Sequence, residues 1–447
     1  MKIVIGGAGA VGTHLATLLS HERHDIVLID EDSEKLHKLS TNLDIMSCSG
    51  KPASIEIQKQ AGVGSADLFI GVTPDETCNV TRCMIASTLG CRKTVARIDN
   101  YEYQDGQFKE FFRQMGINSL VYPELLAAKE VASAIKMSWI SQWWEVGNGE
   151  LVMIGVKMRK EAKILNIRLK ELGKQELPYH VVAIKRGDDT VIPRGEDTVQ
   201  EGDNVFFMTT RKHINTVREV CGKMDYPEIK RLIIMGGGRI AYRTATLLPK
   251  DITVTIIEKD SLRCEKLSAM LKGHTNVWVV NGDGREMNLY DEEGLRHSDA
   301  FIALTGSDEQ NILSCLNARA MGIKKTVAQV EKLEYIKMAE HLSIGTVINK
   351  MTIAATSIYQ TLLKADVNNM KSLTLSNADV AEFIVSTGAT CTKKPVKEIN
   401  FPRDINVGGL VRNGVGMLVR GNTMIEEGDH FVVFCLSGMI QKIQRFF

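Results

Sequence analysis

The sequence predicts an α/β protein with two Rossmann-like, doubly wound parallel-sheet domains, each followed by a small β-rich domain of the α+β type. The first observation behind this prediction is an internal repeat, in which segments recur after about 230 residues. The second is the alternation of short apolar strands with helical segments, which indicates βαβ units on sheets buried on both faces. The chain of 447 residues is long enough for several hydrophobic cores.

The internal repeat begins with a strand and a glycine-rich turn in each copy. Residues 2–12 read KIVIGGAGAVG, residues 231–241 read RLIIMGGGRIA, and each copy continues into a short amphipathic helix that ends in ATLL. Because the copies match in order and spacing, we expect them to form the same sheet twice. The further matched strands are 25–30 with 253–258, 67–73 with 299–305, and 94–97 with 326–329.

The stretches that follow the two Rossmann units also match each other. Residues 181–208 and 407–434 contain short strands separated by Gly, Asp and Asn turns, including Glu201-Gly-Asp203 and Glu427-Gly-Asp429. Such patterns are typical of small β-rich modules. The expected domains are 1–120 and 229–346 for the Rossmann units, and 140–225 and 367–447 for the β-rich domains.

A helix is expected after each Rossmann unit, because apolar residues recur there at spacings of three and four. Each helix is expected to pack either against its own domain or against another domain or a second copy of the chain. The two apolar stripes are Ala128, Val131, Ala132, Ile135 and Trp139, and Val347, Met351, Ala354, Ile358 and Leu362.

The composition argues against a nucleic-acid-binding protein and against a membrane-spanning one. Lys plus Arg is 55 and Asp plus Glu is 54, so the net charge of +1 argues against a nucleic-acid binder that relies on bulk positive charge. No apolar run approaches the roughly 18–20 residues that cross a bilayer. The chain opens on a strand rather than a signal peptide, and its nine cysteines are scattered singly, so we expect a cytosolic protein with reduced thiols and no metal site.

The strongest chemical signal is the first glycine turn, Gly7-x-Gly9-x-x-Gly12, which follows a strand and opens a helix. In a dinucleotide-binding turn, the first glycine allows the tight bend, the second lets the backbone approach a pyrophosphate, and the third lets helix and strand pack closely. Free N–H groups and the positive end of the helix dipole then meet the phosphate charge. The candidate residues of this turn are Gly7, Ala8, Gly9, Ala10, Val11 and Gly12.

A carboxylate ends the second strand of each copy. Asp30 lies 23 residues after Gly7, and Glu258 lies 22 residues after Gly236. A carboxylate there accepts hydrogen bonds from the diol of an adenosine ribose and would repel a 2′-phosphate. The sequence therefore favours NAD(H) or another adenine nucleotide over NADP.

The second glycine turn differs from the first where charge matters. It carries Arg239 where the first has Ala10, and its fifth strand ends in Gln329 where the first ends in Arg97. Each site would thus keep one cation for phosphate, and we expect different ligands, such as a dinucleotide in one site and ATP or ADP in the other. The alternative is that both arginines make surface ion pairs. The candidate residues of the second turn are Gly236, Gly237, Gly238, Arg239 and Ile240.

Polar residues follow the fourth strand of each copy, at the sheet edge where doubly wound proteins bind ligands. Thr73, Pro74 and Thr305 are the candidates there, because a Thr hydroxyl can contact ribose or phosphate. Three acids in the same stretches are expected either to cap the following helix or to face the ligand, and capping is favoured. They are Asp75, Glu76 and Asp308.

Asp283 follows the third strand of the second copy, within Asn281-Gly-Asp-Gly284. Asn281 and Asp283 are candidates for the adenine side of a ligand, and a role in the turn is the equal alternative. The counterpart in the first copy, Cys48-Ser-Gly50, has diverged.

These features resemble the RCK (regulator of K⁺ conductance) family, and the tandem order resembles the peripheral subunits of bacterial Trk potassium-uptake systems. The resemblance covers essentially the whole chain and rests on the glycine turns, the strand-end acids, the Thr strand ends and the Glu-Gly-Asp turns. It implies a cytosolic homo-oligomeric ring, at the inner face of the plasma membrane, that gates a potassium-translocating subunit of the TrkH/TrkG type. The site residues that it implies are Gly7, Gly9, Gly12, Asp30, Thr73 and Arg97, and Gly236, Gly238, Arg239, Glu258 and Thr305.

The sequence could also be interpreted as a dehydrogenase or as a DNA-binding repressor, instead of a regulator that is not an enzyme. A dehydrogenase would need a general acid or base near the nicotinamide, and neither β-rich domain offers a His or Lys in a recognisable active-site pattern. His180, just before a predicted strand, has only Asn406 as its counterpart. A DNA-binding repressor would need a helix-turn-helix with a basic recognition helix, and none stands out. Regulation by a bound nucleotide is therefore the favoured function.

Overall fold

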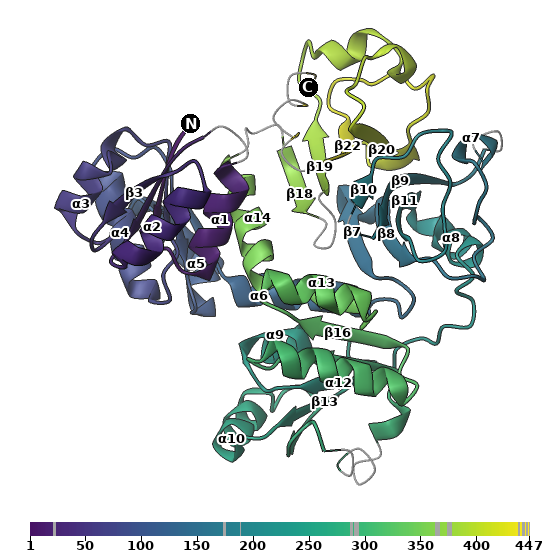
Figure 1. Ribbon diagram of the computed structural model, residues 1–447, viewed down its shortest axis with the longest axis horizontal. Helices are drawn as coiled ribbons and strands as arrows, with labels where there is room; N and C mark the ends of the chain where they lie inside the picture. Colours follow the sequence, from purple (N-terminus) through teal and green to yellow (C-terminus); the bar gives the residue numbers. More distant parts are fainter. Residues whose placement is uncertain are drawn as a thin grey trace. The chain divides into compact units, whose positions relative to one another are not determined.

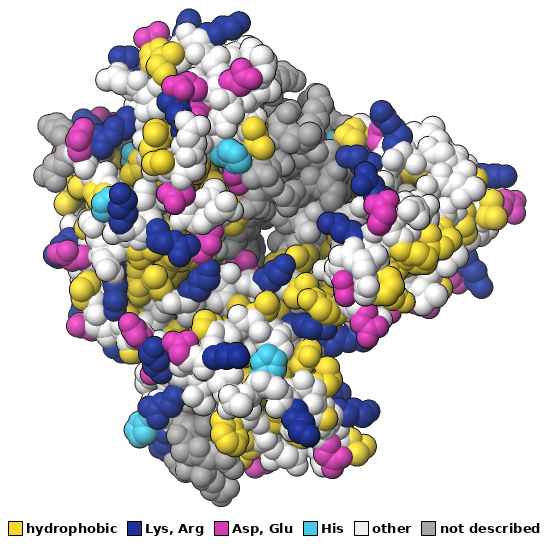
Figure 2. All heavy atoms as spheres, turned by 180° about the vertical axis from the view of Figure 1, so that it is seen from behind, with side chains coloured by type: hydrophobic (Ala, Val, Ile, Leu, Met, Phe, Trp, Pro, Cys, Tyr) yellow, Lys and Arg dark blue, Asp and Glu magenta, His cyan; other side chains and the backbone are white. Residues whose placement is uncertain are grey.

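The computed structural model divides into two compact units, Met1–Leu126 with Lys350–Lys364, and Ala127–Asn349 with Ala365–Phe447 (Figure 1). In the part of the chain that the structure describes, no helix is long and apolar enough to span a membrane. The face drawn in Figure 2 carries Lys and Arg side chains interspersed with Asp and Glu. The described residues are 1–20, 24–172, 176–187, 189–286, 289, 295–362, 367–372, 378–436, 439, 443 and 446.

The first unit holds a six-stranded parallel sheet in the order β3-β2-β1-β4-β5-β6. This is the strand order of a doubly wound Rossmann sheet, whose switch point lies between β1 and β4. Ile3, Val4 and Ile5 of the central strand are completely buried, which explains why the strands read as apolar runs. The strands are β1 (Lys2–Gly6), β2 (Asp25–Asp30), β3 (Met46–Ser49), β4 (Leu68–Gly71), β5 (Thr94–Arg97) and β6 (Ser119–Val121).

A helix from far along the chain completes the first unit. The helix α14 (Lys350–Leu362) packs beside α1 (Figure 1) and also contacts β6. Its Lys350 Nζ lies 3.5 Å from Glu124 Oε1, at the start of α6. The helix that follows the second Rossmann sheet therefore packs on the other Rossmann domain. The remaining helices here are α1 (Ala10–Ser20), α2 (Ser33–Asn42), α3 (Ile55–Gln60), α4 (Glu76–Thr88), α5 (Gly106–Gln114) and α6 (Pro123–Ile135), which continues into the second unit.

The second unit repeats the parallel sheet in the order β14-β13-β12-β15-β16-β17. The helix α12 packs against β15 and β16 (Figure 1). The strands are β12 (Arg231–Met235), β13 (Thr253–Glu258), β14 (Val277–Asn281), β15 (Ala300–Ala303), β16 (Lys325–Gln329) and β17 (Thr346–Ile348). The helices are α9 (Arg239–Leu247), α10 (Ser261–Met270), α12 (Asp308–Ala320) and α13 (Leu333–His341).

Both predicted helices that follow the Rossmann sheets exist, but each apolar stripe extends beyond its helix. Trp139 lies after the end of α6, where it joins the core of the first β-rich domain. Val347 lies before α14, in the edge strand β17, where it pairs with Ala328. Both residues are buried. The apolar spacing therefore predicted correctly which residues are buried, but it did not predict where the helices begin and end. The side chain of Leu362 lies outside the described residues.

Two antiparallel five-stranded sheets complete the second unit, in the orders β10-β9-β11-β8-β7 and β18-β19-β22-β20-β21. They share one core, in which Phe206 and Met208 of the first sheet meet Val432 and Phe434 of the second. The α/β class, with two doubly wound sheets and two β-rich domains, is thus confirmed. The strands are β7 (Gln142–Val146), β8 (Leu151–Lys157), β9 (Tyr179–Arg186), β10 (Asp189–Val191), β11 (Asn204–Thr210), β18 (Val367–Ser372), β19 (Ala378–Ile384), β20 (Ile405–Arg412), β21 (Val415–Leu418) and β22 (His430–Leu436).

The Glu-Gly-Asp turns of the β-rich domains carry a repeated ion pair in which the carboxylate is buried. Asp203 accepts hydrogen bonds from Arg186 Nε and Nη2 at 2.9 and 2.8 Å. Asp429 accepts the same pair of bonds from Arg412, at 2.8 and 2.7 Å. Both carboxylates are 1% exposed, and a two-pronged arginine contact is the geometry that best compensates such burial. The motif therefore ties the turn to the neighbouring strand in both domains.

Candidate functional site

The first glycine turn leaves one of its three glycines free to approach a ligand. Gly7 has a φ of +122°, and a Cβ there would come within 2.7 Å of Thr73 Cγ2. A Cβ on Gly12 would lie 1.9 Å from the Gly7 carbonyl oxygen, so only glycine lets α1 start so close to the turn. A Cβ on Gly9 would meet nothing within 4 Å. The fold therefore requires Gly7 and Gly12, whereas Gly9 borders open space.

The second turn repeats the tight bend and the open position of the first, but a side chain fits at its third position. Gly236 has a φ of +102°, and a Cβ there would lie 2.9 Å from the Leu304 carbonyl oxygen. Gly238 precedes the first residue of α9 and, like Gly9, borders open space. Ala241 stands where the first turn has Gly12, and its methyl group is buried.

The side chains of the other candidate residues in the two turns point to different environments. Ala8, Val11 and Ile240 are buried and belong to the packing beneath the turns. Ala10 and Arg239 are exposed, each at the first residue of its helix. Backbone N–H groups are the part of these residues that a phosphate at the helix start would meet.

The two strand-end acids hold the glycine turns. Asp30 Oδ2 accepts a hydrogen bond from Ala8 N at 2.6 Å, and its Oδ1 accepts one from Asp32 N at 3.0 Å. Glu258 Oε2 accepts one from Gly237 N at 2.8 Å, and its Oε1 accepts one from Asp260 N at 2.9 Å. Each carboxylate oxygen retains acceptor capacity, because it has two lone pairs. The acids therefore shape the turns and can still accept from a hydroxyl group.

The Thr candidates at the ends of the fourth strands are each hydrogen-bonded to an asparagine six residues further on. Thr73 Oγ1 donates to Asn79 Oδ1 at 2.8 Å, and Asn79 Nδ2 donates to the Arg97 carbonyl oxygen at 3.0 Å. In the second copy, Thr305 Oγ1 donates to Asn311 Oδ1 at 2.7 Å, and Asn311 Nδ2 donates to the Gln329 carbonyl oxygen at 2.9 Å. The asparagines thus join the ends of the fourth and fifth strands at the edge that carries the glycine turn.

Of the three acids expected to favour capping, only Asp75 caps its helix. It accepts a hydrogen bond from Cys78 N at 2.9 Å, and this bond lowers the pKa of the Asp75 carboxyl. Glu76 instead accepts bonds from the N–H groups of Asp99 and Asn100, both at 2.7 Å. Asp308 does the same for the equivalent loop after β16. Ser307 caps α12 in its place.

Two arginines at the ligand-binding edge of the first sheet have unsatisfied donors. Arg82, on α4, is 8% exposed and donates from Nη1 to Thr73 Oγ1 at 2.6 Å. Arg97, at the end of β5, has its Nη2 3.4 Å from Asp99 Oδ1. The buried Nε atoms of both arginines find no acceptor among the described residues. Pro74, next to Thr73, is exposed.

The second site is a cavity of about 400 Å³ that combines the glycine turn with three cations. Gly236, Gly237, Gly238, Glu258, Asp283 and Thr305 all line it, whereas Arg239 and Ile240 do not. The cations are Lys259 and Arg263, which follow β13, and Arg285, which follows β14. Their positions differ from those of Arg82 and Arg97, which lie on the other side of the turn.

Asp283 and Asn281 are engaged within the protein. Arg285 donates to Asp283 from Nε at 2.9 Å, and this contact lowers the pKa of Asp283 to about 2. Asn281 Nδ2 donates to the Glu258 carbonyl oxygen at 3.0 Å, which fixes the end of β14 against that of β13. Both residues therefore serve the turn, while Asp283 also lines the cavity.

The sequence reasoning missed Arg82, Lys259, Arg263 and Arg285. A signal for Arg82 existed, because the repeat places Ser314 at the equivalent position of the second copy. The repeat likewise aligns Lys259 with Glu31. A difference in charge between matched positions of the two copies therefore indicates site residues outside the glycine turns as well as within them.

The chain matches two protein families along most of its length. The TrkA-N domain matches residues 3–123 and 232–350, and the TrkA-C domain matches residues 153–222 and 380–447. The chain is 31% identical to the Trk system potassium uptake protein TrkA homolog of Archaeoglobus fulgidus, over the whole of both chains. It is 30% identical to the Trk system potassium uptake protein TrkA of Haemophilus influenzae, over 97% of this chain and 95% of that one.

The fold is similar to that of solved RCK structures. The GsuK channel bound to NAD superposes with a TM-score of 0.61 at 16% identity, covering all of this chain and 78% of that one. The structure of GsuK bound to ADP superposes with a TM-score of 0.50 at 15% identity, covering 81% of this chain and 69% of that one.

Proposed function

Because this chain belongs to the family of Trk potassium-uptake proteins built from TrkA-N and TrkA-C domains in tandem, we propose that it is a nucleotide-binding regulatory subunit that gates potassium uptake. Its role is to control a membrane channel or transporter rather than to carry out a reaction. The observation that carries the proposal is the pair of glycine turns, each bound to a strand-end carboxylate and each bordered by open space.

The ligands are adenine nucleotides, with NAD(H) as the principal one and ATP or ADP in one of the two sites. The unsatisfied Nε donors of Arg82 and Arg97 support an anionic ligand at the first site, because a buried charged donor without an acceptor is costly. The three cations of the second cavity support one there. Asp30 and Glu258 supply acceptors for a ribose diol. GsuK, which shares the fold, has been solved with NAD and with ADP.

The proposed binding residues are those that the sequence singled out, together with the arginines that the structure adds. In the first site they are Gly7, Ala8, Gly9, Ala10, Val11, Gly12, Asp30, Thr73, Pro74 and Arg97, with Arg82. In the second they are Gly236, Gly237, Gly238, Arg239, Ile240, Glu258, Asp283 and Thr305, with Arg263 and Arg285. The proposed domains are 1–120, 140–225, 229–346 and 367–447.

Gating follows from a difference in affinity between two conformations. A ligand shifts a conformational equilibrium only as far as its affinities for the two states differ. We place the chain in a homo-oligomeric ring on the cytoplasmic face of the membrane, bound to a potassium-translocating subunit of the TrkH/TrkG type. No nucleic acid takes part.

The test combines ligand binding, turnover and transport in the intact protein. The purified chain should be stabilised against thermal unfolding by NADH, NAD⁺, ATP or ADP, and should leave NADH unconsumed with any metabolite offered. Cells that lack their own regulatory subunit should take up potassium when they make this chain with its membrane subunit. Absence of any nucleotide effect on unfolding, or steady oxidation of NADH, would overturn the proposal.

A further inference from the structure

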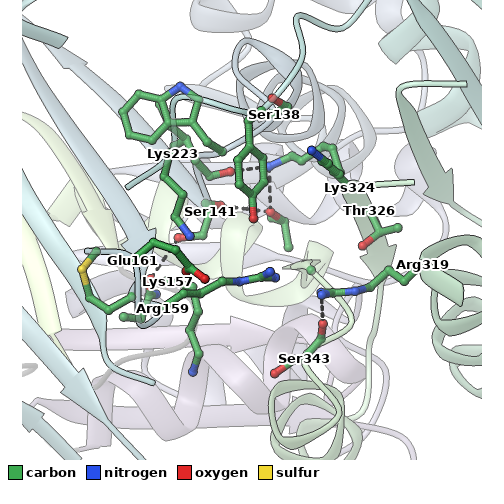
Figure 3. A pocket seen from close by; sticks show the side chains of 18 of the residues that line it. Ser138, Ser141, Lys157, Arg159, Glu161, Lys223, Arg319, Lys324, Thr326 and Ser343 are labelled. Atoms are coloured by element: carbon green, nitrogen blue, oxygen red, sulfur yellow. Dashed lines mark hydrogen bonds between the residues drawn. The ribbon is translucent and has the colours of Figure 1, made fainter. Parts of the chain in front are cut away.

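A basic pocket of about 620 Å³ lies away from both glycine turns, within the second unit (Figure 3). The first β-rich domain forms one side through Arg159, Lys160 and Lys223. The amino-terminal edge of the second Rossmann sheet forms the other through Arg319, Lys324 and Lys325. Ligands on doubly wound sheets bind at the opposite edge, so this pocket is separate from the nucleotide sites.

Cations outnumber acids among the side chains that line this pocket. Seven Lys or Arg residues line it against two glutamates, Glu161 and Glu201, both exposed. Among the described residues, none of the six cations named above lies within 4.0 Å of an acidic side chain. Such a concentration of one sign disfavours the folded protein unless an anion neutralises it.

Lys223 gives the clearest indication that the pocket binds an anionic ligand. The residue is 3% exposed; among the described residues its ammonium makes no hydrogen bond or ion pair, and it lies 5.2 Å from the centroid of the Tyr226 ring. Burial, and then the nearby charge of Arg159, lower its pKa to about 8. Lys324 lies over the same ring at 5.4 Å, so two ammonium groups flank Tyr226.

The two arginines of the pocket face each other from different domains. Figure 3 shows Arg159 and Arg319 extending from opposite sides toward the middle of the pocket. Arg319 is held by the Ser343 carbonyl oxygen, and burial followed by the charge of Arg159 lowers its pKa. Planar guanidinium groups match the oxygen atoms of phosphate well, and two of them can bind one ligand from both sides.

Hydrogen bonds to uncharged acceptors hold the two walls of the pocket together. Lys325 Nζ donates to the Ile140 carbonyl oxygen and, at 3.2 Å, to Thr346 Oγ1. Thr346 Oγ1 donates in turn to the Ser141 carbonyl oxygen at 3.1 Å. The walls are therefore in place without a ligand, and the cations are presented toward a formed cavity.

We propose that this pocket binds a small anion carrying at least two phosphate groups, which bridges Arg159 of the first β-rich domain and Arg319 of the second Rossmann domain. The volume suits such a ligand, because small-molecule sites commonly span about 300–1,000 Å³. Binding would join the two domains more firmly. The proposal does not depend on nucleotide binding at the glycine turns.

Calorimetric titration of the full chain with inorganic tripolyphosphate tests the proposal. We expect one binding event per chain that weakens with added salt, and binding of inorganic phosphate at least about tenfold weaker, because a single phosphate carries less charge to neutralise the cations of the pocket. Arg159→Gln and Arg319→Gln should each weaken tripolyphosphate binding by about tenfold or more. Arg168→Gln is the matched control, since Arg168 is an exposed residue of the same β-rich domain that pairs with Glu196.

One further variant separates this site from the glycine turns, and the stability of Arg159→Gln separates a loss of binding from misfolding. Gly238→Asp should leave tripolyphosphate binding unchanged, because it alters only the second glycine turn. Arg159→Gln should not lower the unfolding temperature of the ligand-free chain, because it removes repulsion between like charges. The proposal is overturned if the wild-type chain does not bind tripolyphosphate, if both arginine variants bind it normally, or if Gly238→Asp abolishes the binding.

Discussion

The two Rossmann domains share one sheet order and one glycine turn, yet they place their cations on opposite sides of that turn. In the first domain, Arg82 and Arg97 lie on the side of β4 and β5. In the second, the cations lie on the side of β13 and β14, and the positions of Arg82 and Arg97 are Ser314 and Gln329. The duplicated backbone thus retained the geometry of a nucleotide turn while the surrounding charge moved.

The amino-terminal edges of the two sheets differ as well. Lys93, before β5, is exposed, whereas the equivalent Lys325 is 3% exposed beneath residues 138–141. Both differences show that a repeated fold conserves backbone contacts more strictly than charge. The two sites are therefore expected to prefer different ligands, and each domain provides the control for the other.

The largest expected effect is on the free energy of unfolding, and it comes from Lys325 at the amino-terminal edge of the second sheet. Burial lowers the pKa of Lys325 to about 7, whereas the unfolded chain holds this proton up to its ordinary value of 10.5. Between these values the unfolded state binds more protons, so the free energy of unfolding should rise with pH, by about 1.4 kcal/mol per unit and about 5 kcal/mol in all.

Lys325→Met should remove most of this rise between pH 7 and pH 10, which denaturant titrations at several pH values would measure. The exposed Lys93 provides the matched control, because Lys93→Met should leave the slope unchanged. Equal slopes for wild type and Lys325→Met would show that the buried ammonium does not lose its proton in this range.

The next effect concerns the glycines that border open space. Gly9→Asp and Gly238→Asp should each fold normally, because a Cβ meets nothing within 4 Å at either position. A carboxylate facing a phosphate should cost about 3 kcal/mol, or roughly 100-fold in affinity, at its own site alone. Thermal shifts with NADH and ATP would measure it. Gly273→Asp, in open space at the other sheet edge, should change neither affinity, and loss of all binding in every variant would contradict two independent sites.

A smaller effect should distinguish the arginines of the first site. Arg82→Met should weaken nucleotide binding there by about tenfold or more, since a hydrogen bond to a charged group contributes roughly 1.5–3 kcal/mol. The ligand-free protein should be no less stable, because the variant removes a buried charge that has no acidic partner among the described residues. Arg92→Met is the control, since Arg92 is exposed and pairs with Asp67. An unchanged titration curve for Arg82→Met would place the phosphate elsewhere.

The smallest effect is expected for Arg263 in the second site. Its Nη1 lies 3.5 Å from Glu258 Oε2, and its side chain is 58% exposed. Arg263→Gln should therefore weaken nucleotide binding by only about two- to fivefold, within the 1 kcal/mol or less that exposed ion pairs contribute. The loss should disappear at high salt because ions screen exposed charges. A loss as large as that of Arg82→Met would show that the second site also depends on a single arginine.

The fold was largely predictable from the sequence, because the repeat displays each element twice. The parallel strands, the glycine turns and the strand-end acids Asp30 and Glu258 were all found this way. The limits of α6 and α14 were not, since burial of Trp139 and Val347 continues the helical spacing into other structure. Glu76 and Asp308 looked like helix caps, but they bind a loop that the sheet brings close from about 23 residues away.

The sequence by itself determined where the backbone must bend and where the sheets must be buried, since these depend on glycine at positive φ and on apolar runs within a few residues. Only the tertiary structure decided which charges meet. The packing of the chain places α14 against α1 and Arg159 opposite Arg319, across long stretches of sequence. Electrostatic interactions act through space and depend on burial, so the local pattern of residues cannot contain them.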